Sequence, residues 1–380
     1  MKVLFLTAWY PTPQRPAFGV FVREHARAAQ QFHDVHLLHV VLTPRAKQKA
    51  GRSIHVEHSR DSDLPVSRAT VSVPPMLGLG DVVYVRLVAE ALAQTGFVPD
   101  VIHCNITLPV GLGALYLKKK LGVPVVLTEH SSDFRLFYTG TAWARVKARR
   151  ALRGVDRVLP VGEGQRKMME VFEPRAKYVT IPNAIDTNMF CPGTNSDRAG
   201  PIQALTVLGL WEHKGIQFFL QACARLPEQS QRALQLTILG SGPYEKELFD
   251  LRDQLGIAGS VHFLPGSRSK AEIATLMREC DFLVHPSLRE ATPCVIIKAM
   301  ACGKPVLATR CGASEYLVGP ASGKIVNKGD ADALAAGLLE MMDDYRGYDA
   351  SRLAEMTALK YSYEAIGRRF DEVYRELTAP

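Results

Sequence analysis

The stretch SLREATPCVIIKAMACGKPV, residues 287–306, decides the fold of the second half of the chain. Glu290 stands just before an expected helix start, with Thr292 as N-cap and Pro293 as first helical residue. A mostly apolar body follows, and Gly303 occupies the usual stop position. A buried strand is expected upstream. The order strand, polar loop, helix start presents backbone N–H groups to an anion such as phosphate, and the nearby carboxylate can address whatever the phosphate carries.

Apolar strand-like runs alternate with helix-like segments along the whole chain. The expected strands are Val3–Leu6, Val35–Val41, Val101–His103, Val125–Leu127, Arg157–Val161, Tyr178–Ile181, Ala204–Leu208, Gln235–Leu239, Val261–Phe263, Phe282–Val284, Pro305–Ala308 and Gly323–Val326. The expected helices are Val20–Gln31, Asp81–Gln94, Gly111–Lys120, Ala142–Leu152, Gly164–Val171, Gly215–Arg225, Tyr244–Leu255, Lys270–Glu279, Val295–Cys302, Ala331–Asp344 and Tyr363–Leu377. This alternation predicts two doubly wound α/β units.

The boundary between the two units is expected near Ile181–Pro201, where Pro, Gly, Asn and Asp concentrate. Two α/β domains joined in this way usually bind ligand in the cleft between them, at the carboxyl ends of their strands. The final helix is a candidate to cross back onto the first domain.

Composition excludes several classes of protein. The 380 residues are 47% apolar and 22% charged, which is typical of a globular protein and not of a disordered one. No apolar run is long enough to span a membrane, and the N-terminal run lacks a cleavage site, so we interpret it as the first strand. Seven cysteines without paired spacing favour reduced thiols and a cytoplasmic location. The net charge of +8 suits an anionic partner or no special partner.

Polar groups follow several expected strands of the first half. Gly19 and Val20 open a helix after a Pro-rich turn, either to approach a ligand closely or as an ordinary turn. Two further sets are expected at neighbouring strand ends, where they indicate a polar substrate site, although a lone histidine is more often structural. These acceptor-side candidates are His103, Asn105, Glu129, His130 and Asp133.

The second half offers two more loops of this kind. Lys214 is expected at the carboxyl tip of a strand, where its ammonium would neutralise a diphosphate, and a solvated loop lysine is the alternative. Gly242 lies in a second glycine turn, Gly240 to Pro243, which lacks the third glycine of a dinucleotide fingerprint.

Metal binding is not expected. The pair Asp61 and Asp63 resembles a metal-binding motif but lies in a polar stretch away from any expected strand end, so solvated loop carboxylates are the favoured interpretation. No zinc-ligand spacing, phosphate-binding P-loop or nucleophile elbow occurs.

The segment WARVKARRALR, residues 143–153, predicts a strongly basic helix that also carries Trp143 and Val146. Such a helix suits an anionic membrane surface. A solvated helix face is the bland alternative, and we favour it slightly.

With these motifs in place, the chain resembles glycosyltransferase family four, retaining enzymes of the GT-B fold with two Rossmann-like, parallel-sheet domains that face a cleft. The likeness covers nearly the whole chain. It rests on the ordered series GVFVREHARAA, TEHSSDF, VGEG, IPNAID, LWEHKG, LGSGP, HPSLREATPCVIIKAMACGKPV, CGASEYL and YSYEAIGRRFDEVYREL. It implies an acceptor-binding domain of residues 1–185 plus a crossover helix at 363–380, and a donor-binding domain of residues 186–362.

The resemblance also implies roles for single residues. The expected catalytic residues are His130, Lys214 and Glu290: His130 beside the transferred sugar, Lys214 on the diphosphate and Glu290 on sugar hydroxyls. Asn183 would shape the cleft near the hinge, and Glu315 matches a family glutamate. The expected donor-binding residues are Gly19, Val20, Lys214, Gly242, Glu290, Ala291, Thr292, Cys294, Val295 and Lys298. No metal or other cofactor is implied.

Two positions depart from the family pattern. Lys298 stands where a second glutamate usually accepts hydrogen bonds from ribose, and Gly209 stands where an arginine is common. Lysine donates only, so either ribose is held in altered geometry or Lys298 meets an anionic group. Donor identity therefore stays open.

The leading hypothesis is a retaining transferase that moves a sugar from a nucleotide-sugar to a hydroxyl of a cell-surface polysaccharide, a lipid-linked glycan or a metabolite. It would act in the cytoplasm, with peripheral contact to an anionic membrane as an option and no nucleic-acid partner. A catalytically weak glycan- or partner-binding protein is the alternative, and a related phosphorylase or epimerase is a third.

Overall fold

The computed structural model describes residues 1–380 except 45–53, 74–79, 132–139, 194–199, 267 and 380, and it divides into two compact units. The first unit comprises Met1–Ala184 and Tyr363–Pro380, and the second comprises Ile185–Ser362. The boundary expected from sequence lay one residue later, after residue 185. In the described part of the chain no helix is both long and apolar enough to cross a membrane.

The first unit is built on a seven-stranded sheet in the order β3-β4-β2-β1-β5-β6-β7. Its strands are β1 (Lys2–Thr7), β2 (Asp34–Pro44), β3 (Ile54–Asp61), β4 (Leu64–Val73), β5 (Val101–Asn105), β6 (Val125–Glu129) and β7 (Arg157–Pro160). Its helices are α1 (Val20–Gln30), α2 (Gly80–Thr95), α3 (Leu112–Leu121), α5 (Ala142–Gly154), α6 (Glu163–Phe172) and α14 (Tyr363–Thr378), with a short π-helical turn at Thr107–Gly111. All pairs are parallel except the β3–β4 hairpin. The strand order reverses at β1, where doubly wound sheets bind ligands.

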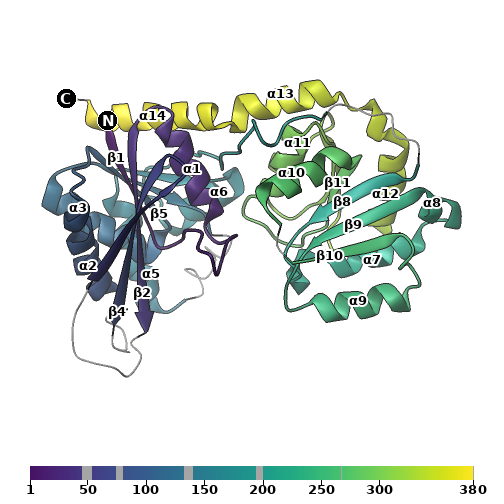
Figure 1. The fold of residues 1–380 in the computed structure, drawn as a ribbon, viewed down its shortest axis with the longest axis horizontal. Coiled ribbons are helices and arrows are strands. Elements are labelled where there is room, and N and C mark those ends of the chain that lie inside the picture. The colour runs from purple at the N-terminus through teal and green to yellow at the C-terminus, as the bar shows by residue number, and fades with distance from the viewer. Residues whose placement is uncertain (45–53, 74–79, 132–139, 194–199, 267, 380) are drawn as a thin grey trace. The chain divides into compact units, whose positions relative to one another are not determined.

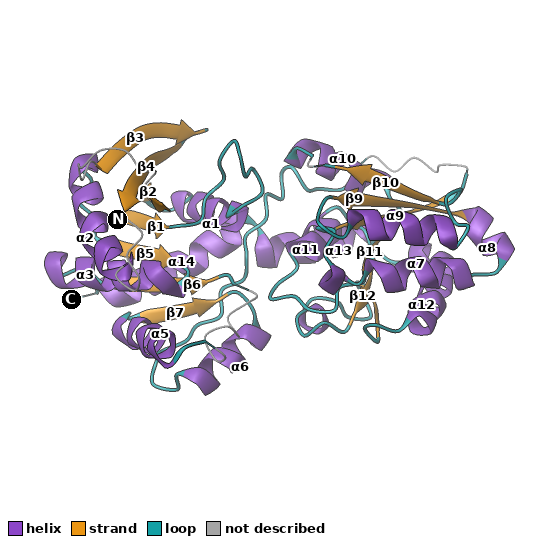
Figure 2. Ribbon diagram, turned by 90° about the horizontal axis from the view of Figure 1, so that it is seen from below, coloured by secondary structure: helices purple, strands orange, loops and turns teal. Residues whose placement is uncertain are grey.

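Helices cover both faces of this sheet (Figure 2). Side chains of α2, α3, α5 and α6 join one buried cluster with one face of the strands. Side chains of α1 and α14 join the cluster on the other face, where Ile366, Phe370 and Tyr374 are fully buried. Figure 1 shows α14 lying along α1, so the C-terminal helix belongs to the first unit, as expected.

The second unit is built on a six-stranded, wholly parallel sheet in the order β10-β9-β8-β11-β12-β13. Its strands are β8 (Ile202–Val207), β9 (Leu234–Gly240), β10 (Val261–Pro265), β11 (Phe282–His285), β12 (Val306–Thr309) and β13 (Gly323–Val326). Its helices are α7 (Ile216–Arg225), α8 (Glu228–Ala233), α9 (Glu245–Gln254), α10 (Lys270–Glu279), α11 (Cys294–Ala301), α12 (Ala331–Asp344) and α13 (Ala350–Tyr361), with 3₁₀ turns at Glu212–Lys214, Ser314–Tyr316 and Tyr345–Gly347. Helices α7, α9 and α12 pack on one face, and α10, α11 and α13 on the other.

Some expectations about elements were wrong. The β3–β4 hairpin was missed because β3 is almost wholly exposed and polar, so it carries no apolar alternation. The expected strand Tyr178–Ile181 is irregular backbone that forms one bridge, between Val158 and Tyr178, beside the edge strand β7. Helices α8 and α13 were not expected either.

Several histidines are buried and hold their rings neutral. Burial lowers the pKa of His25 and His39 to about 4, and it lowers the pKa of His103 and His130 well below the usual value. These four rings lie in the first unit, and burial also lowers the pKa of His285 in the second unit to about 4.

Acid should therefore destabilise the first unit before the second. An unfolded histidine takes up a proton near pH 6.5 and these folded ones do not, so each ring removes up to about 1.4 kcal/mol of unfolding free energy per pH unit below that value. We expect hydrogen–deuterium exchange followed by mass spectrometry, between pH 7 and 4, to show the first unit opening at higher pH. His39→Gln should make its acid response shallower, and equal responses of the two units would contradict this explanation.

Candidate active site

The N-terminal end of helix α11 differs from the one expected from the sequence. Helix α11 begins at Cys294, and Pro293 occupies the N-cap position with φ −76° and ψ 91°. Thr292 is not the cap, because its hydroxyl donates to the carbonyl of Ala291 (2.8 Å). Pro293 is in extended conformation, with ψ far from the helical range, so the first helical residue is the next one. The N–H groups of the first helical turn, such as that of Val295, have no acceptor four residues earlier within the helix itself.

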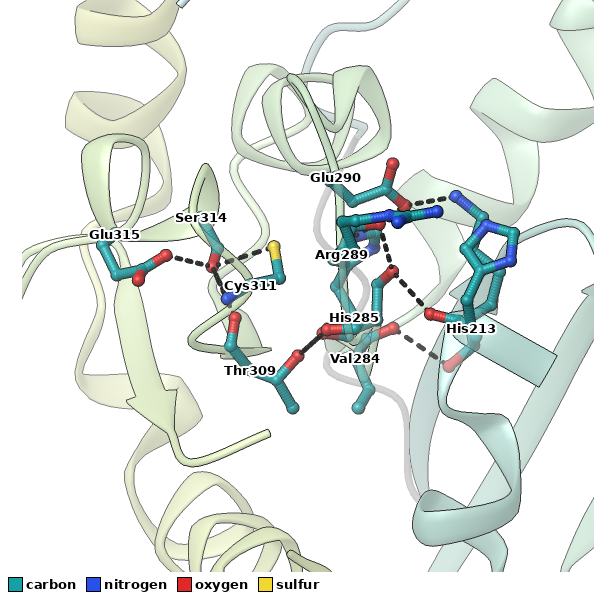
Figure 3. A network of polar contacts seen from close by, with 12 residues as sticks. His213, Val284, His285, Arg289, Glu290, Thr309, Cys311, Ser314 and Glu315 are labelled. Carbon is teal, nitrogen blue, oxygen red and sulfur yellow. Dashed lines mark hydrogen bonds and ion pairs between the residues drawn. The ribbon is translucent and has the colours of Figure 1, made fainter. Parts of the chain in front are cut away.

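Hydroxyl groups from the neighbouring strands fix the β11–α11 loop (Figure 3). Thr206 on β8 donates to the carbonyl of Val284 (3.0 Å), and Thr309 on β12 donates to the carbonyl of Ser287 (2.5 Å). The Ser287 hydroxyl in turn lies 3.5 Å from the carbonyl oxygen of His213, to which it donates. The loop after β11 is thereby tied to both neighbours at the carboxyl edge of the sheet.

Lys214 and Glu290 form an ion pair at this edge. The Lys214 ammonium donates to Oε1 of Glu290 over 2.7 Å, and the two side chains are 18% and 13% exposed. We had expected Lys214 at the tip of the strand, but it ends a 3₁₀ turn that follows β8. Gly215 follows at φ 69°, where an added Cβ would lie 2.2 Å from the carbonyl oxygen of Pro286. The two loops therefore touch, and this contact requires glycine.

His285, the last residue of β11, lies beneath this ion pair. Its side chain is 1% exposed, and its Nε2 lies 3.6 Å from Oε1 of Glu290. Within the described part of the chain, neither ring nitrogen has a hydrogen-bond partner. Burial, opposed by the charge of Glu290, holds the His285 pKa low, so the ring is neutral.

The other expected donor-side residues lie around the same edge. The Lys298 ammonium lies 5.0 Å from the centre of the Phe190 ring, a cation–π contact. Gly242 is packed so that an added Cβ would lie 2.2 Å from the carbonyl oxygen of Leu210. The carboxylate of Glu315 accepts hydrogen bonds from the Gly312 N–H and the Ser314 hydroxyl (Figure 3).

The first unit brings a second polar cluster together around His130. The His130 Nε2 lies 3.1 Å from Oδ1 of Asn105, and its Nδ1 lies 3.2 Å from Oδ1 of Asn183. The ring stacks on Phe21 at 4.5 Å, and His25 lies 5.0 Å away. His130 is 7% exposed and neutral, so its ring can form hydrogen bonds but carries no charge.

Glu129, next to His130, organises the loop after β5. It is buried and accepts hydrogen bonds from the N–H and hydroxyl of Thr107 and from the N–H of Ser131. Burial raises its pKa, whereas these hydrogen bonds oppose that change. The held segment includes Ile106 at φ 70°, a conformation that is strained for a β-branched residue. Glu129 therefore supports the position of Asn105 and His130.

His103 lies inside the core and not after the end of its strand. It is the third residue of β5, is fully buried, and contacts the Tyr374 hydroxyl at 2.5 Å and the Thr128 hydroxyl at 2.6 Å. The structural interpretation holds for His103, and we leave it out of the candidate site. Asp133 lies outside the described residues.

Two further expected positions have structural explanations. Gly19, at φ 73°, precedes Val20, the first residue of α1, and an added Cβ would lie 2.5 Å from the backbone of Trp9. Asp61 is the last residue of β3, so our placement of it away from a strand end was wrong. Its carboxylate accepts from the Tyr10 hydroxyl (2.8 Å) and pairs with Arg27 (2.9 Å). Among the described residues no group of three or more His, Cys, Asp or Glu side chains is arranged to hold a metal ion.

Comparison with known sequences gives two successive family matches. Residues 18–189 match the sequence model described as Glycosyltransferase Family 4, and residues 195–358 match Glycosyl transferases group 1. The putative colanic acid glycosyltransferase WcaL of Escherichia coli is 29% identical over 59% of this chain and 56% of its own length. The putative teichuronic acid glycosyltransferase TuaC of Bacillus subtilis is 24% identical over 98% of this chain and 95% of its own. The chain thus spans little more than half of WcaL and nearly all of TuaC.

Solved structures share the fold over the whole chain. A sucrose-phosphate synthase from Thermosynechococcus elongatus superposes with a TM-score of 0.77 at 19% identity and covers both chains completely. Anabaena HepE in complex with UDP gives a TM-score of 0.76 at 21% identity, over 99% of this chain and 100% of that one. The two family matches and this shared architecture show that the chain belongs to glycosyltransferase family 4 and has the GT-B fold.

Proposed function

We propose that the protein transfers a sugar from a nucleotide-sugar donor to an acceptor hydroxyl, with retention at the anomeric carbon. The observation that carries the proposal is the Lys214–Glu290 ion pair beside the start of α11. One cation, one carboxylate and a helix N-terminus are the groups that a diphosphate-linked sugar needs. The retaining outcome rests on family membership.

In this proposal each partner of the ion pair takes its own part of the donor. The Lys214 ammonium turns to the diphosphate, the N–H groups at the start of α11 bind phosphate oxygens, and Glu290 accepts hydrogen bonds from sugar hydroxyls. As the bond to the diphosphate breaks, negative charge grows on the leaving group. Preorganised cations and N–H dipoles stabilise that charge, usually the largest single contribution to catalysis. A departing phosphate oxygen can take the acceptor proton, so no side-chain base is required.

The donor is proposed to be a nucleoside diphosphate sugar. HepE, which shares the fold, was solved with UDP and with UDP-glucose. In this chain Lys298 stands near the expected ribose, and its ammonium is held over Phe190. Its ammonium therefore offers a hydrogen-bond donor at a position where a carboxylate would accept hydrogen bonds. We propose no metal, because Lys214 and the helix start supply the positive charge.

The acceptor is proposed to bind the first unit near His130, Asn105 and Asn183. These polar groups are oriented by Glu129 and by each other. WcaL and TuaC are named for the biosynthesis of colanic acid and teichuronic acid, which supports a polysaccharide, lipid-linked glycan or glycosylated metabolite as acceptor. We place the reaction in the cytoplasm.

Lys214→Ala should lower turnover at least tenfold, or about 1.4 kcal/mol in the barrier, because it removes the cation from the leaving group. The donor is first identified by mass spectrometry of products from a panel of nucleotide-sugars. Lys246→Ala is the matched control, since Lys246 is exposed on α9 and pairs only with its neighbour Asp250 among the ion pairs of the described residues. Unchanged turnover of Lys214→Ala would refute the assignment.

The alternative function is a catalytically weak protein that binds glycans or partners. Lys298 and Gly209, which replace two usual family residues, favour it. Thermal unfolding with UDP, GDP, ADP, CDP and TDP separates the two. Stabilisation by one nucleotide supports the transferase, and stabilisation by none supports the alternative.

Helix α5 is proposed as a peripheral contact with an anionic membrane. Trp143 and Val146 are 66% and 54% exposed, and Arg150 follows at the spacing that puts it on the same helix face. Arg149 and Arg153 instead serve packing within the unit: Arg149 lies over the Phe172 ring, and Arg153 pairs with a glutamate. An exposed aromatic side chain among cations suits a lipid surface.

Replacing Trp143 and Arg150 together with Ala should weaken binding to vesicles that contain phosphatidylglycerol about fivefold or more, since each basic residue contributes about 1 kcal/mol at such a surface. Sedimentation with phosphatidylcholine vesicles, with and without the anionic lipid, measures this. Arg232→Ala on α8 is the control, because Arg232 is also exposed but belongs to the second unit. Equal sedimentation with both vesicle types would contradict the membrane contact.

A further inference from the structure

The side chain of His285 is buried, and its hydrogen-bonding capacity is unused. It is 1% exposed, and neither ring nitrogen has a hydrogen-bond partner among the residues that the structure describes. A buried imidazole without a partner costs stability, since its hydrogen bonds to water are lost and nothing replaces them. Such a ring is expected to have a partner in some other state of the protein.

The charged groups beside the His285 ring indicate which hydrogen-bond partner it would have. The His285 Nε2 lies 3.6 Å from Oε1 of Glu290, just beyond hydrogen-bonding distance. The same oxygen is taken by the Lys214 ammonium at 2.7 Å. The two groups that electrostatically face the ring are Glu290 and Lys214. His285 and Lys214 therefore compete for one oxygen, and Lys214 holds it in this structure.

The ring is held in place, whereas Glu290 lies in a loop. His285 ends β11, and its carbonyl accepts a hydrogen bond from the Thr309 hydroxyl of the neighbouring strand at 3.3 Å. A shift of well under 1 Å by the Glu290 carboxylate would bring Oε1 within hydrogen-bonding distance of Nε2. No rearrangement of the sheet is needed.

We propose that His285 is a positioning residue that takes over Glu290 when Lys214 leaves it for the donor. This inference rests on the proposed function. Once the ammonium turns to the diphosphate, the Glu290 carboxylate loses its partner in a largely buried place. The neutral ring then donates Nε2–H to Oε1, which keeps the carboxylate ionised and aimed at the sugar. Burial holds the ring neutral, so its proton sits on one nitrogen and the other can stay bare.

A positioning role predicts that loss of His285 changes the affinities for two ligands differently, which a packing role does not predict. Lys214 meets the diphosphate, which a nucleoside diphosphate and its sugar both carry, whereas Glu290 meets only the sugar. Loss of His285 should therefore weaken the sugar-nucleotide and spare the bare nucleotide. A histidine that merely fills space would weaken both ligands together, or neither.

Calorimetric titration tests this with five matched pairs of probes: UDP and UDP-glucose, GDP and GDP-mannose, ADP and ADP-glucose, CDP and CDP-glucose, TDP and TDP-glucose. For the pair that binds the wild-type protein, His285→Leu should weaken the sugar-nucleotide about tenfold, or ~1.4 kcal/mol, and leave the nucleotide within twofold. His285→Gln, which keeps an N–H of similar reach, should retain most of the affinity. Adding Glu290→Gln to His285→Leu should cost little more than either change alone, because the two act as one unit.

Each outcome decides the matter. His262→Leu, at an exposed histidine of the same unit, is the control and should change neither affinity. Equal loss for both ligands, no loss, additive loss in the double variant, or failure of both His285 variants to fold would each overturn the positioning role and leave the proposed function standing. Failure of the wild-type protein to bind any of the five pairs would overturn the proposed function, and the role of His285 with it.

Discussion

The Lys214–Glu290 ion pair is the interaction on which the rest of the site depends. Each partner is stable in a largely buried place because it has the other, and each is the group that a sugar diphosphate would use. The parallel sheet supplies the geometry, since its carboxyl edge brings the β8 and β11 loops together and Gly215 lets them touch. In the proposed function, a donor would meet a site that is already assembled, and its charges would replace contacts that the free protein makes internally.

Much of the fold is predictable from sequence because buried parallel strands are mostly apolar. β11 and β12, for example, are short continuous runs with every residue buried. The β3–β4 hairpin fails this test, as its first strand is polar and exposed and exists because Asp61 and its neighbours pair with β4 and α1. The start of α11 lies one residue later than expected because Pro293 is extended and the Thr292 hydroxyl donates to the Ala291 carbonyl, and neither feature shows in the residue types.

Residue types alone did not separate the site from its support. His103 and His130 follow similar strands in the sequence, yet one is enclosed by Phe370 and Tyr374 and the other stands at the sheet edge between two asparagines. The difference arises from α14, which is distant in the chain and covers the first ring only after folding. His285 went unnoticed for the same reason, since an unpaired buried nitrogen is a property of packing. The available clue in the sequence was that His285 directly follows the expected strand Phe282–Val284 and stands five residues before Glu290.

A crystal structure of the protein with the nucleotide-sugar that it turns over tests the central claim most directly. The account predicts density for the diphosphate between the Lys214 ammonium and the first N–H groups of α11, with the sugar against Glu290 and the ion pair of the free protein broken. Density at another place, with Lys214 and Glu290 still paired at hydrogen-bonding distance, would contradict it.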